Sequence, residues 1–150
     1  MRSSPPMSDK DGEAKPPPPG FEISKSRGPF TTRNGPVYRA IETGDIRSGL
    51  WVLDRHCNSM GFMHGGMVSA FADGALAWAV WHATHRMSVT LKLTTSYYDT
   101  IRPGDWLEAH PRVVSVDDGV VHVEAEMLVG GEKLAARADA TFRALRRTSK

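Results

Sequence analysis

The spacing of apolar residues along the chain changes from irregular to helical and then to alternating. Residues 37–42 alternate weakly, and residues 49–54 form an apolar run that ends in a turn-like segment, so each range predicts a short strand. From residue 65 to about residue 83 the apolar residues recur at helical spacing, which predicts one long helix. The residues expected on its buried face are Val68, Phe71, Ala72, Ala75, Leu76 and Ala79.

The expected helix is apolar almost all the way round. Met67, Trp78 and Trp81 extend its apolar surface well beyond one face. A helix with so little polar surface has to be covered by other elements, and a curved sheet is the expected cover.

After residue 85 the apolar period changes to two, the period of strands with one buried face. Strands are predicted over residues 88–99, 105–116, 120–129 and 133–145, with the turns RPGD, DDG and GG between them. Proline lacks a backbone N–H, so Pro111 requires an edge, a bulge or a bend.

In the first of these strands, residues 88–99, the apolar face is expected to carry Val89, Leu91 and Leu93, and the other face Thr90, Lys92 and Thr94. In the last strand, one face is expected to carry Leu134, Ala136, Ala138, Ala140 and Phe142.

This order of elements predicts an α+β fold, in which a curved, mostly antiparallel sheet of five to six strands wraps a long central helix. Residues 1–28 are polar and proline-rich, with no apolar face to bury, and are expected to form a disordered leader. Residues 29–146 are expected to form a single domain, and residues 147–150 a short basic tail.

The composition excludes several classes of protein. The chain has 150 residues and a formal net charge of only +2, and its one basic cluster is the C-terminal tail, so no nucleic acid is expected as a partner. No apolar run of about 18 residues is present, so no membrane span is expected. No secretory signal is visible, and Cys57 is the only cysteine, so the expected compartment is the reducing cytoplasm.

Residues 56–80, HCNSMGFMHGGMVSAFADGALAWAV, carry the candidate chemistry. Gly65 and Gly66 stand where the helix begins, and glycine lets another molecule approach the backbone closely. The first helical N–H groups have no partner inside the helix, and the helix dipole places partial positive charge there. Such a place suits a carbonyl oxygen that becomes negative during a reaction.

Each polar residue of this stretch also has an ordinary structural explanation. An aspartate in an apolar helix can be a satisfied carboxylate, a histidine before a helix can cap it, and an asparagine can simply form a turn. The combination is more specific: Asn58, His64 six residues later, Gly65-Gly66 at once, and Asp73 nine residues after His64. This pattern, N-x-x-G-x-x-H-G-G followed by a small-residue helix with an aspartate, resembles the hotdog-fold thioesterases. More narrowly, it resembles the PaaI-like acyl-CoA thioesterases of the phenylacetate pathway.

The resemblance continues through Thr90, Tyr97 or Tyr98, and the turn 103–105, and it covers roughly residues 35–145. It implies a hotdog fold and an enzyme that hydrolyses an acyl- or aryl-acyl-CoA thioester. It implies no cofactor and no metal, since coenzyme A is part of the substrate, and a homodimer that pairs into a homotetramer. Trp78 and Trp81 are bulkier than the residues common in the family, which is expected to shorten or reshape the acyl pocket.

The resemblance also implies a role for each candidate residue. The Gly65 N–H would polarise the thioester carbonyl, and Asp73 of the facing subunit would activate a water or attack directly to form an anhydride. Thr90, from the same subunit as Asp73, would hydrogen-bond that water or the carboxylate. Asn58 and His64 would hold the loop and the thioester, with Asn58 also placed to contact the water.

Helix geometry adds an argument for a site shared between subunits. Gly66, which is expected to contact the substrate, and Asp73 project from the same side of the helix about 10 Å apart along its axis. This separation is too long for both to touch one carbonyl within a single chain, so activity is expected to need at least a dimer.

Other classes of function remain open at this stage. A hotdog dehydratase or hydratase usually shows a D-x-N-P-x-H or H-F-P-type motif, which this chain lacks. A non-catalytic acyl-CoA-binding or sensing protein would not need the carboxylate of Asp73. A zinc hydrolase is suggested by His64, His82 and His85, but no third ligand is evident near the last two. A Ser-His-Asp hydrolase would need a G-x-S-x-G motif, which is absent.

Overall fold

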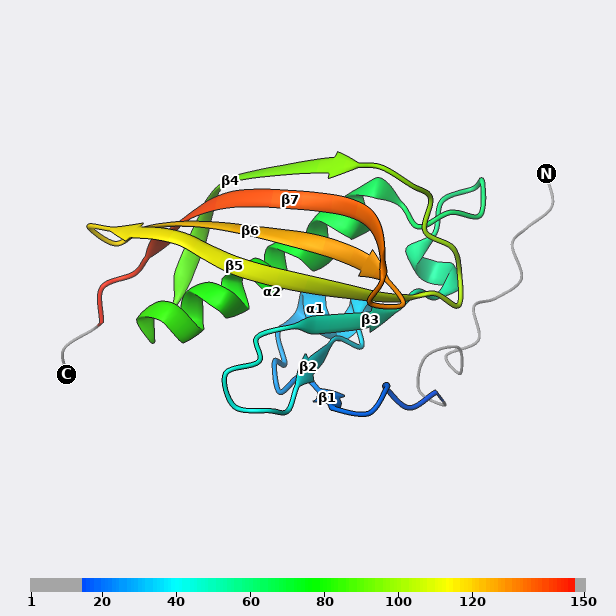
Figure 1. Ribbon diagram of the computed structural model, residues 1–150, viewed down its shortest axis with the longest axis horizontal. Helices are drawn as coiled ribbons and strands as arrows, with labels where there is room; N and C mark the ends of the chain where they lie inside the picture. Colours follow the sequence, from blue (N-terminus) through cyan, green and yellow to red (C-terminus); the bar gives the residue numbers. More distant parts are fainter. Residues whose placement is uncertain (1–14, 148–150) are drawn as a thin grey trace.

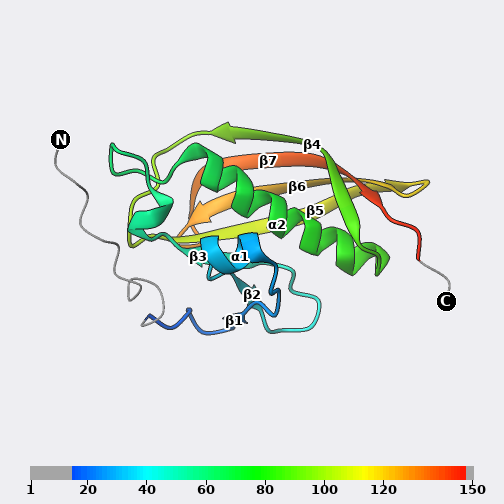
Figure 2. The same cartoon turned by 180° about the vertical axis from the view of Figure 1, so that it is seen from behind.

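The computed structural model describes residues 15–147, and the structural statements below concern these residues. Seven strands form one antiparallel sheet in the order β1-β2-β3-β5-β6-β7-β4. The elements are β1 (Phe21–Ile23), α1 (Pro29–Asn34), β2 (Tyr38–Ala40), β3 (Ser48–Trp51), the 3-10 turn η1 (Asp54–His56), α2 (Gly65–Thr84), β4 (Ser88–Tyr97), β5 (Trp106–Asp117), β6 (Val120–Val129) and β7 (Lys133–Ala144). Figure 1 shows the sheet from its outer side, and Figure 2 shows α2 running along the other face.

Helix α2 begins and ends where its flanking residues leave helical geometry. His64 has an extended backbone, and its ring Nδ1 accepts a hydrogen bond from the Gly66 N–H. At the other end His85 takes a left-handed conformation with φ 52°. The predicted helix over residues 65–83 is therefore confirmed to within one residue. Its buried side chains are the six predicted from the spacing, together with Val80.

One hydrophobic core lies between α2 and the inner face of the sheet. Leu76 of α2 packs there with fully buried side chains of the strands, including Leu50, Leu107, Met127 and Phe142. Burial of each such side chain stabilises the fold by about 1.5–3 kcal/mol relative to exposure. A long helix wrapped by an antiparallel sheet is the predicted hotdog arrangement, with seven strands instead of five to six.

Ordered structure begins earlier than the sequence pattern indicates. Strand β1 lies inside residues 1–28, so the expectation of a disordered leader is wrong for Phe21–Ile23. β1 pairs with β2, and the Phe21 ring packs edge-on against Trp106 with 5.2 Å between ring centroids. A strand of three residues has no periodicity to detect, and a partner far along the chain holds it in place. Residues 1–14 of the expected leader and 148–150 of the expected tail lie outside the described residues.

Two details of the long strands test the predicted pattern. Strand β3 pairs with β5 only from Trp106 to Ala109, so Pro111 faces no strand on that side, which is the edge among the three predicted alternatives. Leu134, in contrast, is not on the buried face of β7. The register between β6 and β7 shifts near Leu128, and Leu134 is 37% exposed, so its predicted place on one face with the buried Ala136 is wrong.

Candidate active site

The candidate residues Asp73 and Thr90 contact each other directly. Asp73 lies on the side of α2 that faces β4 and is partly buried. The Thr90 hydroxyl on β4 donates a hydrogen bond of 2.6 Å to Asp73 Oδ1. Within residues 15–147 no donor lies against Asp73 Oδ2, so this oxygen is available to accept from a water molecule.

Thr90 reaches the helix because β4 contains a bulge. Thr90 pairs with the buried Phe142 of β7, and Leu93 pairs with the buried Ala140, so both side chains face α2. Strict alternation would put Thr90 and Leu93 on opposite faces, but Leu91 is an extra residue at the bulge between them. The predicted separation of these two residues onto opposite faces is therefore wrong, and the bulge is the reason.

The first turn of α2 keeps one backbone N–H without an acceptor. The His64 carbonyl accepts from the Met67 and Val68 N–H groups, and the His64 ring accepts from the Gly66 N–H at 2.9 Å. Among the described residues nothing accepts from the Gly65 N–H. A Cβ at Gly66 would lie 3.0 Å from His64 Nδ1, so the cap favours glycine there. A free N–H at a helix N-terminus suits an oxygen that gains negative charge.

Asn58 shapes the loop that leads into α2. Its Oδ1 accepts from the N–H groups of Met60 and Phe62 at 3.0 and 3.3 Å, and its own backbone N–H donates to the Phe62 carbonyl at 2.8 Å. Gly61 has φ 83°, a conformation that glycine adopts without strain, and this closes the turn. In the part of the chain that the structure describes, Asn58 Nδ2 has no acceptor, so the amide can donate to a water or a ligand.

A row of polar contacts, here named the α2–β4 seam, joins the helix start to Asp73. The Tyr97 hydroxyl donates to the Gly65 carbonyl at 2.7 Å. Ser69, one turn further along α2, shares hydrogen bonds of 2.9 Å with the hydroxyls of Tyr97 and Thr95. Asp73, four residues after Ser69, ends the row. Helical spacing of four was a signal that could have identified Ser69 from the sequence, whereas its partners on β4 depend on the bulged register.

The seam divides the predicted site residues into two groups within one chain. The first group, at the start of α2, is Asn58, His64, Gly65 and Gly66, and the second is Asp73 and Thr90. Eight residues at the helical rise separate Gly65 from Asp73 by about 12 Å. A single chain therefore does not bring the carboxylate to the free N–H.

His56, to which the sequence pattern assigned no role, anchors the same loop. Its buried ring accepts at Nδ1 from the Leu53 N–H at 3.0 Å and donates from Nε2 to the Asn34 carbonyl of α1 at 2.6 Å. The His56 carbonyl accepts from the His64 N–H at 2.9 Å, which links α1 to the residue that caps α2. Burial lowers the pKa of His56, because a charged imidazole would lose its hydration.

We expect His56 to make the fold less stable in mild acid. As the pH falls through about 6.5, the unfolded chain takes up a proton at His56 and the folded chain does not. The free energy of unfolding should therefore fall more for the wild type than for His56→Gln between about pH 7.5 and about pH 5.5. Urea unfolding at one protein concentration measures both proteins. An equal fall in the two would contradict the lowered pKa.

The described residues form no candidate metal site. Within residues 15–147 no group of three or more His, Cys, Asp or Glu side chains is placed to hold a metal ion. His64 and His82 lie near opposite ends of α2, about 27 Å apart along its axis, so the zinc-hydrolase alternative gains no support. Of the helices described, none combines the length and the apolar character that crossing a membrane requires.

Comparisons with known proteins relate this chain to thioesterases. The family model described as "Thioesterase superfamily" matches residues 60–136, which include Gly65, Asp73 and Thr90. The curated Pseudomonas aeruginosa protein named "Putative esterase PA0474" is 31% identical over 128 residues, which are 83% of this chain and 95% of that protein. The match therefore covers most of both proteins.

Solved structures with a similar fold include the E. coli PaaI protein from the phenylacetic acid degradation operon. It superposes with a TM-score of 0.64 at 20% identity, over 68% of this chain and 73% of that one. A Streptococcus mutans protein, smu.793, solved with bound acetyl CoA, gives a TM-score of 0.63 at 23% identity, over 69% of this chain and 82% of that one. These two likenesses support the hotdog fold.

Proposed function

The chain belongs to the thioesterase superfamily, and on this premise we propose that it hydrolyses acyl- or aryl-acyl-CoA thioesters to the free acid and coenzyme A. One observation carries the proposal. The α2–β4 seam has a water-accessible carboxylate, Asp73 with Thr90, at one end and the free Gly65 N–H at the other. These are the base and the oxyanion donor that thioester hydrolysis needs. The acetyl-CoA-bound neighbour from S. mutans supports a coenzyme A thioester as the ligand.

The proposed dimer forms along the free edge of β4. Among the described residues β4 pairs only with β7, which leaves the N–H and C=O groups of its other edge open. Val89 and Leu91 of this strand are 46% and 53% exposed, and their burial would stabilise an interface. The described residues thus offer a long edge strand with apolar side chains to a second copy.

Two-fold pairing of β4 with its copy completes the site. In an antiparallel pair with its axis near the middle of the strand, the Thr90 end of one strand lies beside the Tyr97 end of the other. Thr90 holds Asp73, and Tyr97 holds Gly65 through its carbonyl. Such a dimer brings the carboxylate of one subunit toward the free N–H of the other, at two equivalent sites. Two such dimers are proposed to form the homotetramer.

The proposed reaction uses these groups in order. The Gly65 N–H donates to the thioester oxygen, which becomes negative as the carbonyl carbon is attacked. Asp73 of the other subunit takes a proton from the attacking water, or its own oxygen attacks first and water then opens the anhydride. The carbon–sulfur bond breaks, and the coenzyme A thiolate leaves and is protonated. Thr90 keeps the carboxylate oriented, and Asn58 Nδ2 holds the water or the thioester.

A panel of acyl-CoA thioesters tests the proposed function. The purified protein is expected to release free thiol from alkyl- or aryl-acyl-CoA, followed continuously with a thiol colour reagent. An enoyl-CoA in the same panel, monitored for water addition, tests the hydratase alternative. Binding of acyl-CoA with no release of thiol would contradict hydrolysis and support the acyl-CoA-binding alternative.

A further inference from the structure

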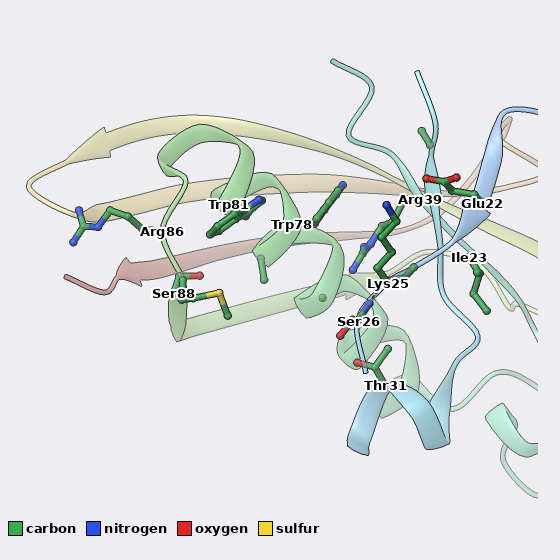
Figure 3. Close-up of a pocket in the computed structure, with 15 residues that line it drawn as sticks. Glu22, Ile23, Lys25, Ser26, Thr31, Arg39, Trp78, Trp81, Arg86 and Ser88 are labelled. Carbon is green, nitrogen blue, oxygen red and sulfur yellow. Dashed lines mark hydrogen bonds between the residues drawn. The ribbon is translucent and has the colours of Figure 1, made fainter. Parts of the chain in front are cut away.

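A cavity of about 500 Å³ lies on the outer side of α2, between the N-terminal strands and the start of β4. Figure 3 shows Trp78 and Trp81 projecting from α2 on one side and Arg39 of β2 on the other. Gly74 and Ser88 also line it. Gly74 directly follows Asp73 on α2, and Ser88 lies two residues before Thr90 on β4, so the cavity is lined by chain neighbours of both candidate residues, although Asp73 and Thr90 themselves are not among its lining residues.

Arg39 contributes a half-buried positive charge that the described chain does not neutralise. Its Nη1 donates to the Ser48 hydroxyl, and its buried Nε has no hydrogen-bond partner. No carboxylate of residues 15–147 forms an ion pair with Arg39, although Glu22 lies opposite it in the β1–β2 register. Burial lowers the pKa of Arg39 to about 10, so the guanidinium stays charged near neutral pH. A partly buried cation without a counter-ion loses part of its hydration, and an anion from outside would offset that loss.

Trp78 adds a second buried donor at the same wall. The guanidinium carbon of Arg39 lies 5.1 Å from the centre of the Trp78 ring, which holds the two side chains together. The Trp78 Nε1–H is buried and, like Arg39 Nε, has no acceptor within the described residues. Two neighbouring donors without acceptors make this wall complementary to a group that only accepts hydrogen bonds.

The charge of the whole cavity has the same sign. Of the residues that the structure describes, Lys25, Arg39 and Arg86 line it together with a single acidic side chain, Glu22. Trp78 and Trp81 supply apolar surface, and Figure 3 shows Trp78 beside Arg39 and Trp81 on the side of Arg86. The cavity therefore combines apolar indole walls with cationic side chains, and Arg39 stands at the Trp78 end.

From this arrangement we infer that the preferred substrates are thioesters whose acyl group ends in a carboxylate, with Arg39 and Trp78 as the specificity-determining residues. The inference rests on the proposed function. The thioester lies at Asp73, the acyl chain runs along the Trp78 wall, and its terminal carboxylate accepts hydrogen bonds from Arg39 and Trp78. The phosphates of coenzyme A are another source of anionic oxygen, but a cation packed on the apolar Trp78 ring fits the end of an acyl chain.

Two thioesters that differ in the terminal group test the inference. The wild-type protein is expected to show kcat/KM at least about tenfold higher for glutaryl-CoA than for hexanoyl-CoA, because a hydrogen bond to a charged group contributes that much. Arg39→Met should abolish the preference and change hexanoyl-CoA hydrolysis by less than about threefold. Arg39→Gln, which keeps an amide near Ser48, serves as a second variant if the methionine variant folds poorly.

Lys25→Met is the matched control, because it removes the same charge from an exposed part of the cavity rim. It should keep the preference for glutaryl-CoA, and an equal loss in both variants would overturn the role of Arg39. Equal loss of both thioesters in Arg39→Met, with weaker binding of free coenzyme A, would assign the cavity to the phosphates and also overturn the inference.

The same comparison separates this inference from the proposed function. Hydrolysis of both thioesters at equal rates by the wild type would contradict the inferred preference for a terminal carboxylate but would establish thioesterase activity. Calorimetric titration of Asp73→Asn with the two thioesters gives a readout without turnover. If Asp73→Asn binds glutaryl-CoA more tightly than hexanoyl-CoA and the wild type hydrolyses neither, the result would support the specificity of the cavity and contradict the proposed reaction.

Discussion

Replacing Asp73 by asparagine is expected to lower kcat/KM for thioester hydrolysis by at least about 100-fold, the usual size of a lost general base. An asparagine Oδ1 can still accept the hydrogen bond that Thr90 donates to Asp73, so the fold and the seam should persist. The amide cannot take a proton from water or attack a carbonyl. Thiol release from the best substrate of the panel measures the loss.

Asp139→Asn is the matched control for this substitution. Asp139 is exposed on β7, where it pairs with Thr94 and takes no part in the seam. The control should keep wild-type activity, and thermal unfolding and gel filtration should show both variants folded and equally assembled. Near-normal hydrolysis by a correctly assembled Asp73→Asn protein would remove Asp73 from the mechanism.

Replacing Gly65 by proline is expected to lower the rate by about 10²- to 10³-fold, the usual cost of one oxyanion donor. Proline deletes the N–H that the described chain leaves free, and the first position of a helix tolerates it. His64 before it has φ −61° and ψ 132°, the extended backbone that a following proline requires. The added Cβ would lie 3.4 Å from the Tyr97 hydroxyl oxygen, close to ordinary contact.

Gly65→Ala places the same Cβ beside Tyr97 and keeps the N–H, so it should retain activity within a few-fold of the wild type. A similar loss in the alanine and proline variants would assign the effect to the Cβ and not to the N–H. Circular dichroism should show α2 intact in both proteins.

Mixing the two inactive proteins tests whether the site is shared between subunits. After joint unfolding and refolding, half of the dimers pair an Asp73→Asn subunit with a Gly65→Pro subunit, and one of the two sites in each is intact. Activity should therefore recover to about one quarter of the wild type. No recovery from a mixture shown to contain mixed dimers would place both groups of one site in the same chain.

The sequence alone determined the elements whose pattern is local and long. The buried face of α2 and the full extent of β6 from Val120 to Val129 follow from periodicity, because each apolar residue repeats a direction that its neighbours share. The motif from Asn58 to Asp73 could also be identified from the sequence, because a turn, a helix cap and one helix determine the spacing of its residues. The need for an edge, a bulge or a bend at Pro111 also followed, because a missing N–H is a property of the residue itself, and the structure has the edge.

Only the tertiary structure decided the features that depend on contacts between distant parts of the chain. Strand β1 is held in place by the packing of Phe21 on Trp106. Its three residues are too few to show the alternating pattern that predicts a strand. A single extra residue, Leu91, turns Thr90 toward Asp73, and a bulge arises from how β4 pairs with β7. The unpaired charge of Arg39 beside Trp78 likewise appears only when β2 and α2 are packed together, because orphaned donors are a property of an environment and not of a residue.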